Sequence, residues 1–153
     1  MENIVLASSS TTRQKILKAA GVAFEIKTAR VDEREIKNAL FEEGAEPPFI
    51  AETLAEHKSC AVSRRLSERL VLGADQVLEC ENKFYSKPET LDNAREQLLS
   101  LRGKEHCLTS SVVVSQNGER VWHYNETALL QMRSFSDQFL DSYILKERDH
   151  LLD

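Results

Sequence analysis

The chain has 153 residues, of which 41% are hydrophobic and 29% charged, as in one ordinary globular domain. Its net charge of −5 argues against a nucleic-acid backbone as a partner, because binding such a backbone requires clustered Lys and Arg. No segment approaches the ~20 apolar residues of a membrane span, and the start, MENIVLASSS, does not resemble a signal peptide. We therefore expect a cytoplasmic protein without a nucleic-acid or membrane partner.

The cysteines and histidines give no metal-binding pattern. Three cysteines are an odd number at no metal-like spacing, which is typical of reduced thiols in a cytosolic protein: Cys60, Cys80 and Cys107. The four histidines likewise form no metal site or catalytic triad pattern. Neither residue type therefore indicates a metal site.

The first part of the chain alternates short apolar runs with helical periodicity. In chain order, the pattern predicts a strand over 4–7, a helix over 13–20, a strand over 22–28, an irregular acidic segment over 31–48 with one helical turn at 36–41, and a helix over 49–66. Gly21 directly follows the first helix, as expected of a C-terminal cap.

The second part ends in a hairpin and a helix. The pattern predicts a strand over 71–78, a weaker strand near Phe84, a helix capped by Thr90 that stops at Gly103, strands over 106–115 and 120–132 around an Asn117-Gly118 turn, and a helix over 135–146. Strands and helices that alternate before a hairpin indicate the α/β class with a mixed sheet and flanking helices.

The polar loop between the first strand and the first helix is a candidate phosphate site. It reads Ser8-Ser9-Ser10-Thr11-Thr12-Arg13, and a helix N-terminus offers backbone N–H groups and a positive dipole end to an anion. Arg13 adds a planar cation and Ser8 and Ser10 add hydroxyl donors. Ordinary helix capping is the simpler interpretation of the same residues, because Ser and Thr are common N-cap residues.

Asp75 interrupts an otherwise apolar strand. An ionised carboxylate there is costly to bury without a cationic partner or a metal, so Asp75 is a candidate functional residue. Gly73 leaves room for a close approach of backbone or ligand. A structural hydrogen bond at a strand end is the alternative.

Two lysines and one glutamate are further candidates, each with a simpler explanation. Lys58 lies at the edge of the apolar stripe of helix 49–66, where snorkelling of its ammonium into water is the simpler interpretation. Lys87 is held extended by Pro88, although a surface lysine is the default. Glu33, in the run Asp32-Glu33-Arg34-Glu35, offers a metal-binding oxygen or belongs to a solvated loop.

The order of these motifs resembles the Maf-like nucleotide pyrophosphatase family. The matching segments are L-A-S-S-S-T-T-R, V-A-F-E, V-D-E-R-E, L-A-E-H-K, G-A-D-Q, S-K-P and A-R-E-Q-L-L-S-L-R-G-K-E-H. The resemblance implies an α/β fold similar to the inosine-triphosphate pyrophosphatases, with two lobes around a cleft. It also implies one Maf-like domain over residues 1–153 that lacks the family's C-terminal segment.

The resemblance implies that a nucleoside triphosphate is hydrolysed between its α- and β-phosphates. Asp75 would be the catalytic base, and Asp75 with Glu33 would hold Mg²⁺ or Mn²⁺. The phosphate-binding residues would be Ser8, Ser10, Arg13, Lys58 and Lys87.

The sequence departs from the family pattern at two points. Thr11 and Thr12 replace the Pro and one Arg of the usual S-x-S-P-R-R loop, which removes one cationic contact. Gln76 follows the aspartate, as in the branch that acts on 7-methyl-GTP, and is expected to determine specificity.

Two other functions use nearly the same residues. One is a non-catalytic nucleotide-binding regulator of cell division, and the other is a metal-dependent phosphatase of another α/β family that releases phosphate instead of pyrophosphate. The oligomeric state stays open between a monomer and a homodimer.

Overall fold

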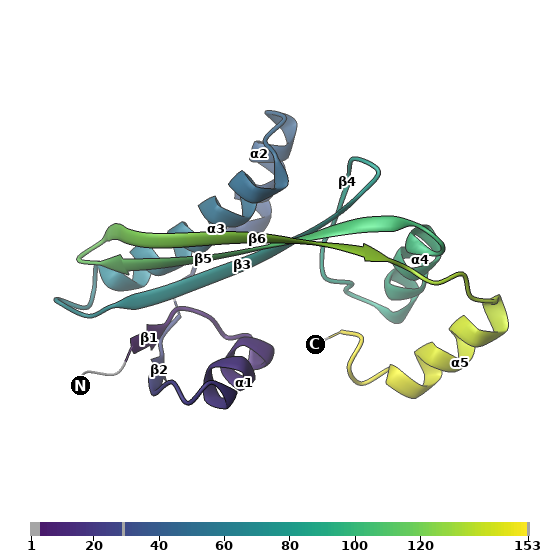
Figure 1. The fold of residues 1–153 in the computed structure, drawn as a ribbon, viewed down its shortest axis with the longest axis horizontal. Coiled ribbons are helices and arrows are strands. Elements are labelled where there is room, and N and C mark those ends of the chain that lie inside the picture. The colour runs from purple at the N-terminus through teal and green to yellow at the C-terminus, as the bar shows by residue number, and fades with distance from the viewer. Residues whose placement is uncertain (1–3, 29, 153) are drawn as a thin grey trace. The chain divides into compact units, whose positions relative to one another are not determined.

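The structure is a computed structural model that describes residues 4–28 and 30–152. The sequence start at residues 1–3 lies outside them. In chain order the elements are β1 Ile4–Leu6, α1 Thr11–Ala19, β2 Phe24–Ile26, α2 Glu33–Glu42, α3 Pro47–Ser63, β3 Val71–Cys80, β4 Lys83–Tyr85, α4 Leu91–Leu101, β5 Glu105–Gln116, β6 Glu119–Gln131 and α5 Asp137–Glu147 (Figure 1).

The strands form one mixed sheet in the order β2-β1-β3-β5-β6, with β4 beside β3. β1 is parallel to β2 and to β3, whereas β4 is antiparallel to β3. The α/β class with a mixed sheet and flanking helices is therefore confirmed.

The chain divides into two compact units, in agreement with the two lobes expected from the sequence. The first comprises the described residues up to Gln76 together with Thr109–Glu126, and the second comprises Val77–Leu108 and residues 127–152. The strands β3, β5 and β6 each contribute residues to both units.

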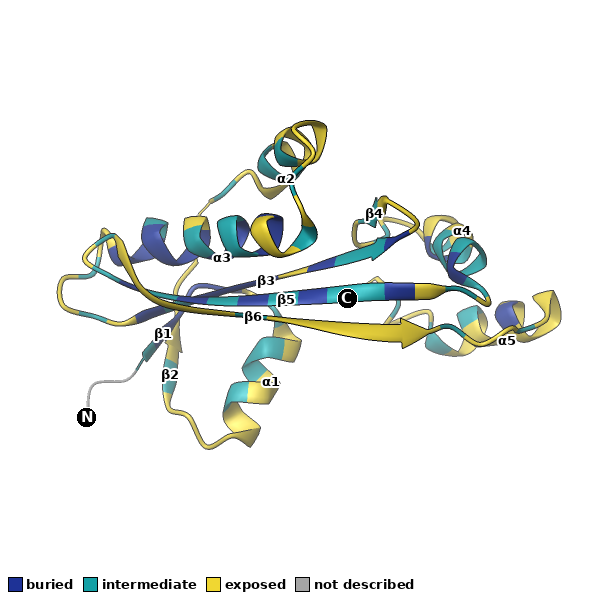
Figure 2. Cartoon of the chain, turned by 45° about the horizontal axis from the view of Figure 1, so that its top comes forward, coloured by how far each residue is buried: buried dark blue, intermediate teal, exposed yellow. Residues whose placement is uncertain are grey.

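The first unit is organised around β1. The chain runs from β1 through α1 to β2 on one side, and from β2 through α2 and α3 to β3 on the other. In this unit α1 and α3 lie on opposite faces of the sheet in both ribbon views (Figures 1 and 2). β1 is thus the strand at which the topology reverses, and ligands of open α/β sheets bind beyond the carboxyl end of such a strand.

Helix α3 packs unusually close to β3. Its apolar face is buried through Ile50, Leu54 and Ala55. A Cβ added at Gly73 would overlap the Ala55 carbonyl oxygen and lie 2.9 Å from both the Cβ and the backbone N of Ser59. The absence of a side chain at Gly73 therefore sets the separation between α3 and β3, as the sequence suggested.

The second unit is held by α4 and α5, which contact each other. Leu101 and Leu140 are buried, and Arg95 donates from Nε and Nη2 to Asp141 Oδ1 at 3.1 and 3.0 Å. Arg102 Nη1 donates to Asp137 Oδ1 at 2.6 Å, so ion pairs bind the first turns of α5 to α4 and to the segment that follows it.

The expectation for residues 31–48 is wrong in part, because α2 is a full helix over Glu33–Glu42. Asp32 is its N-cap, and its Oδ1 accepts a hydrogen bond from Glu35 N at 3.0 Å. An Asp three residues before a Glu is a helix-start signal. The acidic composition of the segment obscured that signal.

The other expected elements are present with shifted ends, and the Asn117-Gly118 turn is confirmed. Asn117 and Gly118 have φ values of 53° and 85°, which is the left-handed pair that a two-residue hairpin needs. β6, the returning strand, lies at the edge of the sheet and is exposed along most of its length (Figure 2).

No helix in residues 4–28 and 30–152 is both long and apolar enough to cross a membrane. Cys60 and Cys80 are buried, Cys107 is half-buried, and all three are free thiols.

We predict that Gly73→Ala destabilises the fold by about 2 kcal/mol, because the new methyl group overpacks the contact between α3 and β3. The measurement is the free energy of unfolding in urea. Gly44→Ala is the control, because no atom lies within 4 Å of a Cβ at Gly44 and only its φ of +76° is strained. A Gly73→Ala protein as stable as wild type would show that this contact does not set the separation.

Candidate functional site

The loop after β1 forms a small hydrogen-bonded unit at the N-terminus of α1. Ser10 is the N-cap, and its Oγ accepts a hydrogen bond from Arg13 N at 3.4 Å. Ser8 is buried, and its Oγ accepts from Ser10 N at 3.3 Å and from Arg13 Nη1 at 3.0 Å. The capping interpretation is confirmed for Ser10, and the same bonds hold the Arg13 guanidinium beside the helix N-terminus.

The register of the sheet brings this loop to Asp75. Val5 pairs with Val71 and Leu6 with Leu72, and Ala7 N donates to Leu72 O at 2.8 Å. Because β1 and β3 are parallel, the residues that follow Ala7 lie at the level of residues 73–75. The loop and the aspartate therefore lie at the same end of the sheet, where the topology reverses.

Asp75 forms a buried ion pair with Lys58. Lys58 Nζ donates to Asp75 Oδ1 at 2.6 Å, and the two side chains are only 9% and 10% exposed. The snorkelling interpretation of Lys58 is therefore wrong: the ammonium is buried against a carboxylate.

Glu33 joins the pair from α2. Its Oε2 lies 2.8 Å from Lys58 Nζ, and its side chain is 53% exposed. Two carboxylates from different elements thus converge on one ammonium. The carboxylate of Glu33 takes part in this cluster instead of belonging to a solvated loop.

The environment raises the pKa of Asp75 above its usual value. Burial is the main cause, and the nearby charge of Glu33 adds to it, whereas the cations of Lys58 and Arg13 act in the opposite direction. A carboxylate with a raised pKa accepts a proton more readily than an ordinary aspartate. This property suits a general base.

The sequence analysis missed Lys37. It follows Glu33 by four residues on α2, so both side chains project from one face of that helix. Lys37 is half-buried, burial lowers its pKa, and the charge of Asp75 partly opposes that shift. Recognition of the Asp32 cap would have predicted the helix and with it the shared face.

Gln76 and Lys87 are the two remaining expected site residues. Gln76, next to Asp75 on β3, is exposed, and its Nε2 donates to Ser110 Oγ at 2.8 Å. Lys87 is exposed in the second unit, in the loop between β4 and α4. The first unit therefore brings together six of the expected residues: Ser8, Ser10, Arg13, Glu33, Lys58 and Asp75.

A family model described as Maf-like protein matches residues 3–151. The chain belongs to the Maf-like family. This agrees with the resemblance seen in the order of the sequence motifs.

Relatives of this Maf-like chain are longer than it is. It is 49% identical over 140 residues to the nucleoside triphosphate pyrophosphatase of Paramagnetospirillum magneticum (strain ATCC 700264 / AMB-1), a match that covers 92% of this chain and 72% of the relative. It is 40% identical over 143 residues to the 7-methyl-GTP pyrophosphatase of Rhizobium meliloti (strain 1021), covering 94% and 72% of the two chains.

Among solved structures, the chain is similar to a HAM1 protein from Coxiella burnetii. The TM-score is 0.50 at 12% sequence identity, over 86% of this chain and 72% of the HAM1 protein. At that identity the similarity concerns the fold alone.

The carboxylates of this Maf-like chain suit a hard divalent cation that arrives with a substrate. Asp75 and Glu33 already hold one positive group, the Lys58 ammonium, at 2.6 and 2.8 Å. No cluster of three or more His, Cys, Asp or Glu side chains suited to a metal occurs in the described part of the chain. Mg²⁺ commonly binds one or two carboxylates together with substrate phosphates, so the two-carboxylate set fits.

We predict that Lys58→Met destabilises the ligand-free protein by about 3 kcal/mol, because it leaves the Asp75 carboxylate buried without its partner. Urea unfolding measures this. Lys104→Met is the matched control, since Lys104 pairs with Glu81 at 2.7 Å on the surface, and it should cost far less. The double variant Lys58→Met/Asp75→Asn should recover most of the loss, and equal losses in single and double variants would contradict the pairing.

Proposed function

We propose that this chain is a nucleoside triphosphate pyrophosphatase, which hydrolyses a nucleotide to its monophosphate and pyrophosphate. The observation that carries the proposal is the buried Asp75 carboxylate, which pairs with Lys58. It lies at the same end of the sheet as the Ser8–Arg13 loop at the N-terminus of α1. The names of the relatives from Paramagnetospirillum magneticum and Rhizobium meliloti support it.

The loop and Lys58 would bind the triphosphate, which carries about four negative charges. Arg13 offers a planar cation that Ser8 already orients through Oγ, and the backbone N–H groups of the first turn of α1 point toward the same end of the helix. Lys58 would supply a second charge from α3. Ser10 would hold the loop in shape as the helix cap.

Asp75 would act as the general base. A water oxygen attacks the α-phosphorus, the bond from that phosphorus to the bridging oxygen of the β-phosphate breaks, and the proton of the water passes to Asp75. Pyrophosphate leaves with the electron pair of the broken bond. The raised pKa of Asp75 favours the proton transfer.

Asp75 and Glu33 would also hold a divalent cation, either Mg²⁺ or Mn²⁺. When bound, such an ion offsets negative charge on the phosphate oxygens. Lys58 lies between the same two carboxylates, so it orients both of them while no substrate is bound.

Gln76 is the proposed determinant of the base. Its amide is exposed and already donates to Ser110, so its carbonyl oxygen remains available to accept a hydrogen bond from a purine edge. The 7-methyl-GTP pyrophosphatase among the relatives favours 7-methyl-GTP as a substrate to test. The three free thiols support a reducing compartment, the cytoplasm.

We predict that the protein with Mn²⁺ or Mg²⁺ releases pyrophosphate and the nucleoside monophosphate in equal amounts. The measurement is separation of the products by ion-exchange chromatography, over a panel that includes 7-methyl-GTP, GTP, TTP and UTP. Omission of the metal and addition of a chelator test the metal requirement separately.

Other products would identify the alternatives. Inorganic phosphate and a nucleoside diphosphate would indicate a phosphatase and contradict the proposal. Nucleotide binding without any product would indicate a non-catalytic nucleotide-binding protein.

A further inference from the structure

Gln76 and Ser110 form a polar pair across two neighbouring strands. Gln76 lies on β3 and Ser110 on β5, which are adjacent in the sheet. Gln76 Nε2 donates to Ser110 Oγ at 2.8 Å, and both residues belong to the first unit. Because Ser110 holds the nitrogen of the amide, the carbonyl oxygen Oε1 is directed away from Ser110.

The pair lies on the face of the sheet opposite to α3. Asp75 is directed to α3, since Lys58 of that helix donates to its Oδ1 at 2.6 Å. Successive side chains of a strand project to opposite faces, so Gln76 projects away from α3, in agreement with its exposure. Ser110 shares that face because it bonds the Gln76 side chain.

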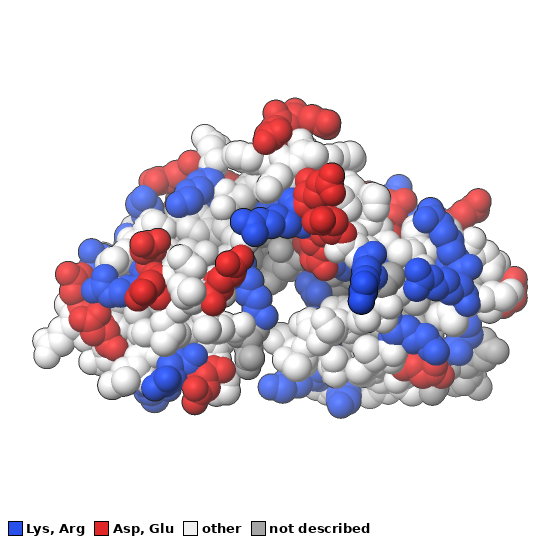
Figure 3. Space-filling view, turned by 180° about the vertical axis from the view of Figure 1, so that it is seen from behind, with Lys and Arg blue, Asp and Glu red and all other residues white. Residues whose placement is uncertain are grey.

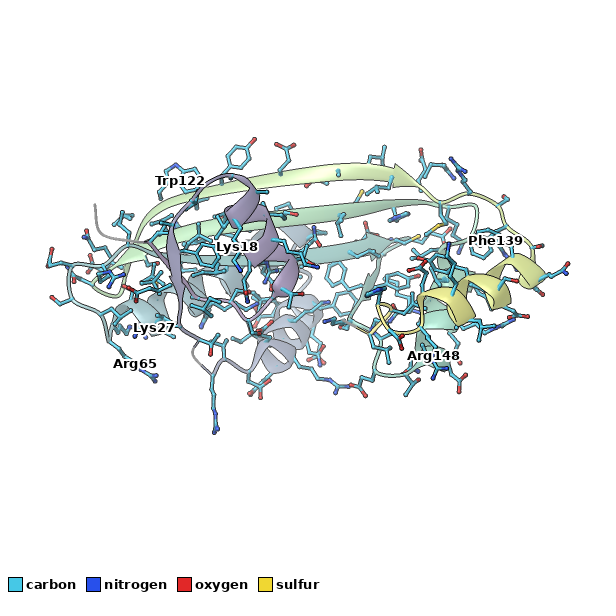
Figure 4. All side chains as sticks on the ribbon, turned by 90° about the horizontal axis from the view of Figure 1, so that it is seen from below. Lys18, Lys27, Arg65, Trp122, Phe139 and Arg148 are labelled. Carbon is cyan, nitrogen blue, oxygen red and sulfur yellow. The ribbon has the colours of Figure 1, made fainter. Side chains whose placement is uncertain are left out.

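This face is also accessible at the edge strand β6. His123 and Asn125 of β6 contact Glu52 of α3 at 3.6 and 2.7 Å. Their neighbours Trp122 and Tyr124 therefore project from the opposite face. The two rings are stacked, and the residues are 52% and 54% exposed; Trp122 is labelled in Figure 4. A ligand can thus approach the sheet from the side on which Gln76 lies.

Gln76 lies beyond the end of β1. That strand pairs with β3 at Val71 and Leu72, before the chain reaches Gln76. In open α/β sheets, ligands bind beyond the carboxyl end of the strand at which the topology reverses. A nucleotide in this position lies beside the edge of β3 and can meet side chains from both faces, Asp75 on one and Gln76 on the other.

Charge alone does not select a base. The phosphates of every nucleoside triphosphate carry the same charges, and acidic and basic side chains are interspersed on the face drawn in Figure 3. Selection requires donors and acceptors placed against the edge of the base. The neutral pair of Gln76 and Ser110 supplies such groups, one residue along the chain from Asp75.

The orientation of the amide determines which base it suits. Guanine carries a donor, N1–H, at the ring position where adenine carries an acceptor, N1. A glutamine amide that turns freely offers its N–H to one base and its oxygen to the other, so it does not discriminate. An amide whose nitrogen is held elsewhere directs its oxygen to the base, which attracts N1–H of guanine and repels the lone pair of adenine N1.

We propose that Ser110 is a positioning residue for base selection: it holds Gln76 by Nε2 and directs Oε1 to the base, so that the site prefers a guanine-type to an adenine-type nucleotide. The inference rests on the proposed function and deepens it. It names the class of base and the residue that makes Gln76 selective.

The test is the ratio of kcat/KM for GTP to that for ATP, measured as pyrophosphate release with Mg²⁺ or Mn²⁺. Wild type should prefer GTP. Ser110→Ala should lower the ratio about fivefold, as expected for loss of one neutral hydrogen bond. Ser110→Thr keeps the hydroxyl and should retain the ratio within about twofold. A wild-type protein without a preference for GTP, or an unchanged ratio in Ser110→Ala, would overturn the proposal.

Ser142→Ala is the matched control. Ser142 is exposed on α5 and donates to Gln138 O at 2.9 Å, so this variant also removes one serine hydroxyl and one hydrogen bond. Its ratio should equal that of wild type. A purely structural role for Ser110 would lower the melting temperature of Ser110→Ala and reduce kcat/KM for both nucleotides by the same factor, which would contradict base selection.

Two further variants show whether Ser110 acts through Gln76. Gln76→Ala has no amide to hold, so the addition of Ser110→Ala should not change the ratio further. Gln76→Glu presents an oxygen in either orientation, so its preference for GTP should persist with or without Ser110. A further fall in the ratio in either background would overturn the positioning role.

The proposal and the proposed function fail separately. Isothermal titration with GMP and AMP measures the same base preference without turnover. A preference in binding that depends on Ser110, without any pyrophosphate release, would overturn the enzymatic function and leave the role of Ser110. Pyrophosphate release with a ratio independent of Ser110 would overturn that role and leave the proposed function intact.

Discussion

The buried ion pair between Lys58 and Asp75 depends on how closely α3 lies against β3. Gly73 permits that approach because any side chain there would overlap the backbone of α3 at Ala55. The approach puts an ammonium and a carboxylate 2.6 Å apart out of water. A buried carboxylate without such a partner would be strongly destabilising, so one glycine makes an otherwise costly side chain tolerable in the core.

The other features of the site follow from the same contact. Lys58 also pairs with Glu33, in the first turn of α2, at 2.8 Å. The parallel register of β1 with β3 brings the Ser8–Arg13 loop to the same level. Arg13 of α1 and Lys58 of α3 thus lie close to the two carboxylates, Asp75 and Glu33.

Local signals made much of the fold predictable. The Asn117-Gly118 turn, the Thr90 cap and the apolar periodicity of residues 49–66 each depend on a few neighbouring residues, and each element is present. Asp75 was recognisable because an acidic residue in an apolar strand needs a special environment. The order of the motifs, more than any one motif, indicated the family.

The remaining features depend on contacts between distant parts of the chain. The periodicity that placed Lys58 at the edge of a stripe cannot tell water from a buried carboxylate, because that depends on the α3–β3 separation. The acidic composition of residues 31–48 concealed α2, and with it the alignment of Glu33 and Lys37. Arg13, by contrast, was identified from its loop, since its partner Ser8 is only five residues away.

The most direct test of the account is the kinetics and nucleotide binding of Asp75→Asn, with Asp92→Asn, an exposed position in α4, as the control. The amide keeps the shape of the side chain and removes the proton acceptor. The account predicts a fall in kcat of at least about 100-fold, with the nucleotide still bound and the fold unchanged by circular dichroism. A wild-type rate of pyrophosphate release from Asp75→Asn would contradict it.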